Sequence, residues 1–205
     1  MAEAIAAPAL GRLVVVGLGL IGGSFAKGLR DKGLFREVIG VDLDPESRRM
    51  AVELGVVDRC EEDLAAACVG ADVIQLAVPI LAMQKLLGAL AQLPLGDAVL
   101  TDVGSAKGNV VRAAALAFDG VPPRFVPGHP IAGSEQSGVE ASNGQLFRRH
   151  KVILTPLADT DGAALQLVDR LWRELGADVE HMDVEHHDEV LAATSHLPHL
   201  LAFGL

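Results

Sequence analysis

The sequence contains very few aromatic residues: six Phe, one Trp and no Tyr in 205 residues. Half of the residues are nevertheless hydrophobic, so the core has to be built from Val, Leu, Ile and Ala. About a fifth of the residues are charged, a balance that excludes a disordered chain. This composition favours a parallel sheet buried beneath helices.

Cysteine and long apolar runs are also scarce. Cys60 and Cys68 lie in an alanine-rich segment without metal-ligand spacing, which is typical of unpaired thiols in a reducing cytoplasm. No stretch approaches the roughly 18 to 20 apolar residues of a membrane span. Residues 1–11 lack the basic and apolar regions of a signal peptide and are predicted to form a short flexible leader. We therefore expect a cytoplasmic protein without a membrane partner.

Positive charge is in deficit, with 17 Lys and Arg against 27 Asp and Glu and a net charge of -10. Nucleic-acid binding requires clustered Lys and Arg on one face, and no such cluster is visible. A local pocket can still be positive on an acidic protein. The expected ligands are therefore small molecules.

Short apolar runs alternate with longer amphipathic stretches from residue 13 onward. A strand is predicted at 13–17, a helix up to about residue 32 and a strand at 38–42, which together form a βαβ unit with parallel strands. The alternation continues with predicted strands at 72–79, 98–104, 151–156 and 177–182, and with helices at 46–55, 80–93, 106–118 and 160–176. Residues 12–182 are predicted to form an α/β domain of the Rossmann type with a doubly wound, mainly parallel sheet.

Residues 183–205 follow a different pattern. A helix is predicted from near Asp183, is disturbed at Pro198 and is still strongly apolar at Leu205. A helix this apolar needs other elements to cover it. We expect it to be the first helix of a truncated, all-helical second domain.

A glycine-rich turn joins the first predicted strand to the first helix. Gly17, Gly19 and Gly22 form G-x-G-x-x-G. The first glycine allows the tight turn, the second lets the backbone approach a pyrophosphate, and the third lets helix and strand pack closely. The sequence therefore predicts a dinucleotide site that also includes the intervening Leu18, Leu20 and Ile21.

An acidic residue at the end of the next strand predicts the choice of cofactor. Asp42 follows the glycine turn by about 20 residues, where a carboxylate accepts hydrogen bonds from ribose hydroxyls and repels a 2′-phosphate. NAD is therefore favoured over NADP. Arg48 and Arg49 are interpreted as solvated helix charges, with a weakened NAD preference as the alternative, and Asp44 as a helix cap.

The carboxyl ends of the middle strands predict the nicotinamide end of the site, because ligands of doubly wound sheets bind there. Ala77, Val78 and Pro79 follow one strand and are predicted to line this end. Asp102, at the end of the next strand, is predicted to contact the cofactor, and Ser105 follows at the same edge. An ordinary turn with a helix cap is the alternative interpretation of the latter segment.

Five segments in this order resemble the prephenate dehydrogenases, also called cyclohexadienyl dehydrogenases: GLGLIGGS, DVGSAKG, GHPIAGSEQSG, KVILTP and SHLPHLLAF. The resemblance implies NAD-dependent oxidation of prephenate with loss of CO₂, which gives 4-hydroxyphenylpyruvate for tyrosine biosynthesis. Many members of the family also accept arogenate. The resemblance further implies a Rossmann domain followed by a helical domain that forms a homodimer.

The same resemblance implies roles for individual residues. His129 is expected to bind the C4 hydroxyl of the substrate and take its proton as hydride leaves that carbon. Ser105 is expected to hold the hydroxyl or the imidazole, and His199 to lie near the substrate side chain. A neutral imidazole, with a pKa near 6.5, suits such a base. Further substrate contacts are expected from the loop residues Gly133 and Ser134.

The sequence also contains further histidines and allows alternative functions. His196 and His199 share a helical face, but no Cys or carboxylate completes a ligand set, so no metal is expected. His196 is interpreted as structural, and His186 and His187 as a solvated helix face. The alternative functions are an arogenate-preferring dehydrogenase and a non-catalytic NAD-binding regulatory module. The family arginine that binds a substrate carboxylate falls beyond Leu205, so this fragment is expected to bind NAD but to turn over poorly or not at all.

Overall fold

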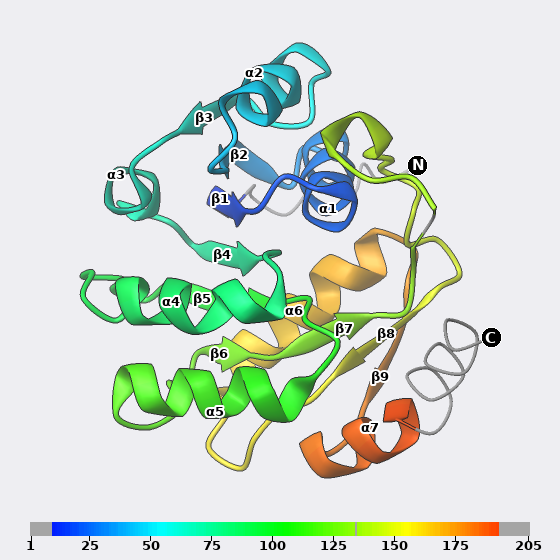
Figure 1. Ribbon diagram of the computed structural model, residues 1–205. Coiled ribbons are helices and arrows are strands. Elements are labelled where there is room, and N and C mark those ends of the chain that lie inside the picture. The colour runs from blue at the N-terminus through cyan, green and yellow to red at the C-terminus, as the bar shows by residue number, and fades with distance from the viewer. Residues whose placement is uncertain (1–9, 134, 193–205) are drawn as a thin grey trace, which may run out of the picture.

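The computed structural model describes residues 10–133 and 135–192. Its centre is a six-stranded sheet in which every neighbouring pair is parallel, in the order β3-β2-β1-β4-β5-β6 (Figure 1). This order, which reverses direction between β1 and β4, confirms the predicted doubly wound fold. The strands are β1 (Leu10–Val16), β2 (Phe35–Val41), β3 (Arg59–Glu61), β4 (Val73–Leu76), β5 (Val99–Asp102) and β6 (Phe125–Val126).

Helices cover both faces of the main sheet, because successive strand residues point to opposite sides. Leu13 and Val15 of β1 belong to one buried cluster, and Val14 and Val16 to the other. The first cluster contains residues of α1 (Leu20–Asp31), α2 (Pro45–Glu53) and α6 (Gly162–Glu174). The second contains residues of α3 (Leu64–Cys68), α4 (Ile80–Leu90) and α5 (Lys107–Phe118).

A second, three-stranded sheet follows the main one in the chain. It consists of β7 (Gly128–Pro130), β8 (Lys151–Leu154) and β9 (Asp178–His181), with β7 antiparallel to β8 and β8 parallel to β9. The short helix η1 (Val139–Ala141) lies between β7 and β8 in the chain. The sequence predicted the last two strands but not a separate sheet, and it predicted a loop where β7 forms. Pro130 is compatible with β7 because that strand lies at the edge of its sheet.

The two ends of the described chain refine the predicted boundaries. β1 begins at Leu10, so Leu10 and Gly11 belong to the sheet and not to the predicted leader. Helix α7 (Val184–Leu191) begins where a helix was predicted and packs against α5 (Figure 1). Within the described residues, no helix is long and apolar enough to span a bilayer.

Candidate active site

A cavity of about 700 Å³ opens at the carboxyl ends of β1, β2 and β4. It therefore lies where the strand order reverses, which is where doubly wound sheets bind their ligands. It brings together most of the residues that the sequence predicted for a cofactor site. The predicted residues in its lining are Gly17, Gly19, Leu20, Ile21, Gly22, Asp42, Ala77, Val78 and Pro79.

The three motif glycines meet different requirements. Gly17 has φ +95°, and a Cβ there would lie 2.4 Å from the Ala77 carbonyl oxygen. A Cβ on Gly22 would lie 2.0 Å from the Gly17 oxygen. A Cβ on Gly19 would have no described atom within 4 Å. The fold itself therefore requires Gly17 and Gly22, whereas Gly19 leaves open space in the cavity wall.

Helix α1 begins directly after this open space. Gly19 is its N-cap and offers no side chain to the first backbone N–H groups of the helix. Such groups carry partial positive charge and bind anions. The open glycine and the uncapped helix start fit the pyrophosphate of a dinucleotide.

The Asp42 carboxylate is held in place at the far side of this turn. Its Oδ2 accepts the Leu18 N–H at 2.8 Å, and its Oδ1 accepts the Asp44 N–H at 3.0 Å. Leu18 itself is fully buried and does not line the cavity. Asp42 remains only half-buried, so its carboxylate is positioned to accept ribose hydroxyls as well.

The arginines after Asp42 differ from each other. Arg48 is 14% exposed, donates to the Asp42 carbonyl oxygen at 2.8 Å and pairs with Glu62. The prediction that Arg48 is solvated is therefore wrong. Arg49 is 55% exposed and pairs with acidic residues of its own helix, as expected for a surface charge.

Asp102 does not lie in the cavity. Its carboxylate is fully buried and forms an ion pair with the buried Lys107 at 2.5 Å. It also accepts the N–H of Gly104 at 2.7 Å and of Gly128 at 3.2 Å. The structure therefore places this side chain in the protein interior, contrary to the predicted cofactor contact.

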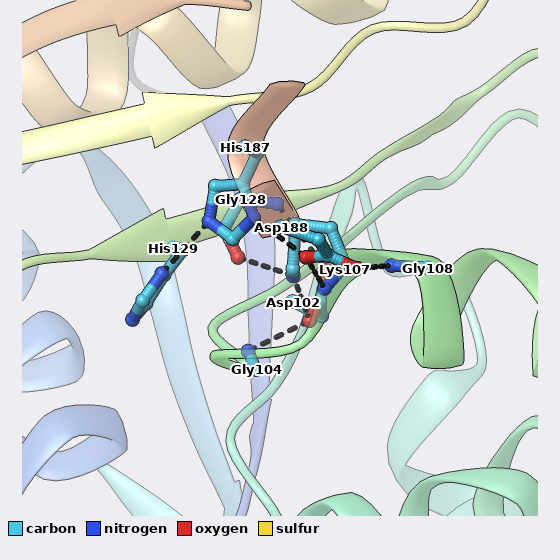
Figure 2. Close-up of polar contacts among 8 residues, drawn as sticks. All are labelled: Asp102, Gly104, Lys107, Gly108, Gly128, His129, His187 and Asp188. Atoms are coloured by element: carbon cyan, nitrogen blue, oxygen red, sulfur yellow. Dashed lines mark hydrogen bonds and ion pairs between the residues drawn. The ribbon is translucent and has the colours of Figure 1, made fainter. Parts of the chain in front are cut away.

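This ion pair joins the turn after β5 to β7. Lys107 Nζ donates to the Gly128 carbonyl oxygen at 2.5 Å (Figure 2). Burial lowers the pKa of Lys107 and outweighs the attraction of Asp102. The exposed Ser105 lies in this turn, and the half-buried His129 follows Gly128 on β7. The two predicted catalytic residues, Ser105 and His129, therefore belong to segments that are joined by the hydrogen bonds of Asp102 and Lys107 to Gly128.

His187 is a site residue that the sequence analysis missed. It is fully buried, and its Nε2 lies 2.9 Å from Nδ1 of His129 (Figure 2). The prediction of a solvated face is wrong for His187, whereas His186 is exposed as predicted. The spacing of the buried Val184, His187 and Leu191 was the available signal, because residues three and four apart share a helix face.

The other side of the His187 ring contacts Asp188. Nδ1 of His187 lies 2.8 Å from Asp188 Oδ1. Burial lowers the pKa of His187 and outweighs the effect of Asp188. Burial opposes ionisation of Asp188, but hydrogen bonds from His187 and from the backbone of Gly108 and Lys107 lower its pKa. At neutral pH the pair is therefore a neutral imidazole beside a carboxylate.

Of the remaining predicted substrate-binding residues, only Gly133 lies within the described part of the chain. Gly133 is exposed three residues after Pro130. Ser134, His196 and His199 lie outside the described residues. Within the described part of the chain, no group of three or more His, Cys, Asp and Glu could hold a metal ion.

Comparison with known proteins identifies the family. The family described as prephenate dehydrogenase, nucleotide-binding domain, matches residues 25–181. The chain belongs to the prephenate dehydrogenase family. Cyclohexadienyl dehydrogenase of Zymomonas mobilis is 37% identical over 194 residues, which cover 94% of this chain and 65% of that relative. The chain thus spans less than two thirds of that family member's length.

Two solved structures of the family share the fold closely. Prephenate dehydrogenase from Aquifex aeolicus, in complex with hydroxyphenyl propionate and NAD⁺, is 40% identical to this chain, with a TM-score of 0.88. The match covers 97% of this chain and 68% of the Aquifex chain. Arogenate dehydrogenase from Synechocystis is 33% identical with a TM-score of 0.82, covering 91% and 65% respectively. The predicted resemblance to the prephenate dehydrogenase family is therefore confirmed.

Proposed function

We propose that this protein binds NAD in the cavity and, in its complete form, catalyses the oxidative decarboxylation of prephenate to 4-hydroxyphenylpyruvate in tyrosine biosynthesis. The observation that carries the proposal is a positioned imidazole beside a dinucleotide cavity in a chain of this family. Val103 lines the cavity and directly follows Asp102 in the chain. Asp102 in turn accepts a hydrogen bond from the backbone of Gly128, the residue before His129, so His129 is connected to the cavity wall. A base in this position has a direct use in hydride transfer.

The cavity provides a separate contact for each part of NAD. The α1 N-terminus and Gly19 hold the pyrophosphate, Asp42 holds the adenosine ribose, and Ala77, Val78 and Pro79 line the nicotinamide end. NAD held in this way would supply the acceptor for the hydride that leaves the substrate ring carbon. NADP is disfavoured because its 2′-phosphate would approach the Asp42 carboxylate.

The protein's own groups handle the proton. Removing hydride from a carbinol carbon builds positive charge there, so a base that takes the hydroxyl proton lowers the barrier. His129 is that base in our proposal, and Ser105 holds the hydroxyl or the imidazole. The C4 carbonyl then withdraws electrons as CO₂ leaves and the ring becomes aromatic. Gly133, Ser134 and His199 contact the rest of the substrate.

An arogenate-preferring dehydrogenase is the second candidate, supported by the likeness to the Synechocystis arogenate dehydrogenase. The two substrates differ by a keto or an amino group on the side chain, which lies away from the reacting carbon. A non-catalytic NAD-binding module is disfavoured, because a module that only binds NAD has no use for His129 and Ser105 at this edge.

The proposed function also implies a domain organisation, an oligomeric state and a cellular location. We propose a helical domain that starts near residue 183 and forms a homodimer, as the family resemblance implies. A cytoplasmic location is supported by two free cysteines, Cys60 and Cys68.

The deciding experiment follows the absorbance of NADH on the complete gene product. Prephenate and arogenate are each tested with NAD and with NADP. Reduction of NAD with prephenate, accompanied by 4-hydroxyphenylpyruvate, is expected. Binding of NAD without turnover of either substrate would favour the non-catalytic module, and faster turnover of arogenate would favour the second candidate.

A further inference from the structure

The ring of His129 is in contact with a chain of polar side chains that begins on α7. Asp188 Oδ1 lies 2.8 Å from Nδ1 of His187, and Nε2 of His187 lies 2.9 Å from Nδ1 of His129. The two imidazole rings meet at 64° with their centres 5.2 Å apart. In Figure 2 the second nitrogen of His129 points away from His187. The family match ends at residue 181, so both α7 residues lie outside it.

Asp188 of α7 caps the N-terminus of α5, which lies about 80 residues earlier in the chain, and this contact fixes the position of α7. Helix α5 has Ala106 as its N-cap and therefore no local side-chain acceptor. Asp188 supplies the acceptor, with Oδ1 3.0 Å from the Lys107 N and Oδ2 2.9 Å from the Gly108 N. The carboxylate that contacts His187 is thus anchored to the helix that begins two residues after Ser105.

The hydrogen positions along this chain follow from its chemistry. An ionised Asp188 only accepts, so Nδ1 of His187 carries the hydrogen between them. A neutral His187 then has a lone pair on Nε2, and Nδ1 of His129 must be the donor between the two rings. Neutral His129 is consequently the Nδ1–H tautomer, whose Nε2 bears the lone pair.

We propose that His187 and Asp188 are positioning residues that hold His129 in the Nδ1–H tautomer, so that Nε2 is the atom that takes the substrate proton. This inference rests on the proposed function for its kinetic consequence. When Nε2 binds the hydroxyl proton, His129 becomes imidazolium and keeps its hydrogen bond to His187. In Ser-His-Asp hydrolases a carboxylate orients the general base directly, whereas here Asp188 acts through the His187 imidazole.

Three variants of the protein separate this role from simple packing. His187→Leu fills the buried space but removes the acceptor for His129. His187→Gln places an amide oxygen near the position of Nε2 and can still accept the Nδ1–H. Asp188→Asn keeps an acceptor for the α5 backbone, but its NH₂ group can donate to His187 and reverse the hydrogen bonds along the chain. The matched control is His186→Gln, at the exposed neighbouring position.

The first measurement needs no enzyme activity. In ¹⁵N-histidine-labelled protein, at a pH where His129 is neutral, imidazole nitrogen shifts report which ring nitrogen carries hydrogen. Signals are assigned by their loss in His129→Asn. We expect protonated Nδ1 on His129 in the unmodified protein and in His187→Gln, and a gain of the Nε2–H form in His187→Leu and Asp188→Asn. An Nε2–H tautomer in the unmodified protein, or the same tautomer in all variants, would overturn the inference.

The second measurement is turnover of prephenate by the complete gene product. We expect His187→Leu and Asp188→Asn to lower kcat by about 10²-fold with little change in KM, because general-base assistance is lost while substrate contacts remain. His187→Gln should retain most of the kcat, and His186→Gln all of it. Equal kcat in the Leu and Gln variants would overturn the positioning role. Absence of turnover in the unmodified protein would refute the proposed function, and the tautomer measurement would still decide this inference.

Discussion

His129 illustrates how one residue depends on its neighbours in three dimensions. The ring is half-buried on an edge strand, and Gly128 beside it is bound by both Asp102 and Lys107. A base held in this way approaches the substrate in one orientation, and a displacement of about 1 Å can lower a rate roughly a hundredfold.

Replacing His129 by Asn tests the proposed base. Asn preserves a polar side chain but cannot take a proton at neutral pH, so kcat should fall by about 10² to 10⁴. NAD affinity and the circular dichroism spectrum should remain unchanged, because His129 does not line the cofactor cavity. The control is His150→Asn, at an exposed position before β8. Normal turnover in a folded His129→Asn protein would refute the assignment.

Gly19→Ala tests the pyrophosphate site without disturbing the fold. The new methyl group meets no described atom within 4 Å, so the urea midpoint should barely change. The methyl group would occupy the space where the backbone approaches the pyrophosphate, so NAD affinity should fall at least tenfold, or about 1.4 kcal/mol. Calorimetry of NAD binding measures this effect.

The matched control for this change is Gly88→Ala in α4. That position also has open space around a Cβ and does not line the cavity. Alanine in a helix is more stable than glycine by roughly 0.5–1 kcal/mol, so this variant should be slightly stabilised with unchanged NAD binding. Equal NAD affinity in both variants would argue against a pyrophosphate site at Gly19.

At the scale of elements, the site depends on ion pairs and hydrogen bonds between segments that lie far apart in the sequence. The Asp102–Lys107 ion pair connects the turn after β5 with β7. Both side chains are fully buried, so the attraction between them has to compensate for the loss of hydration of two charges. Removing one partner leaves the other charged and buried.

Lys107→Met should therefore destabilise the protein by about 3–5 kcal/mol, because Asp102 would keep an uncompensated buried charge. Urea denaturation followed by fluorescence of Trp172, which is buried against Phe25 and Phe147, reports the change. Lys151→Met removes an exposed ion pair with Glu180 and should cost less than about 1 kcal/mol. Similar losses in the two variants would contradict the importance of burial.

The elements also show what the sequence could and could not predict. Periodicity predicted the main helices and strands, and G-x-G-x-x-G with Asp42 predicted the cofactor cavity, because these signals are local. The burial of Asp102 depends on its ion pair with Lys107, and the burial of His187 depends on α7 packing against α5. Local patterns do not encode such contacts, so both were predicted wrongly. The Gly128–Pro130 strand was missed because its strand character comes from pairing with β8.

At the scale of the whole molecule, several carboxylates form ion pairs or hydrogen bonds that exist only in the folded state. Glu37 on β2 bonds Arg59 on β3 at 2.7 Å and Arg12 on β1 at 2.8 Å. Hydrogen bonding from Arg59, reinforced by Arg12, lowers the Glu37 pKa against the effect of burial. The pKa values of Asp44, Glu46, Asp169 and Asp188 are also lowered.

Stability should consequently decrease in acid. A carboxyl group whose pKa is lower in the folded state stabilises the fold at a pH above its unfolded value, near 4.5 for Glu37. That contribution is lost as the pH falls through the folded pKa. Urea midpoints measured from pH 7 down to pH 3 should therefore decline below about pH 4.5. Glu37→Gln should flatten this decline, and Glu185→Gln, on the exposed face of α7, should leave it unchanged.

The contact of Asp188 with the start of α5 also affects how this fold can be divided or recombined. Cutting the chain after β9, where the family match ends, would leave a complete parallel sheet. It would also uncap α5 and open the space beside Lys107 and Gly108 that α7 now fills. A chimaera that borrows this cofactor domain should therefore retain α7 through Leu191, because the cooperative unit extends beyond the last strand.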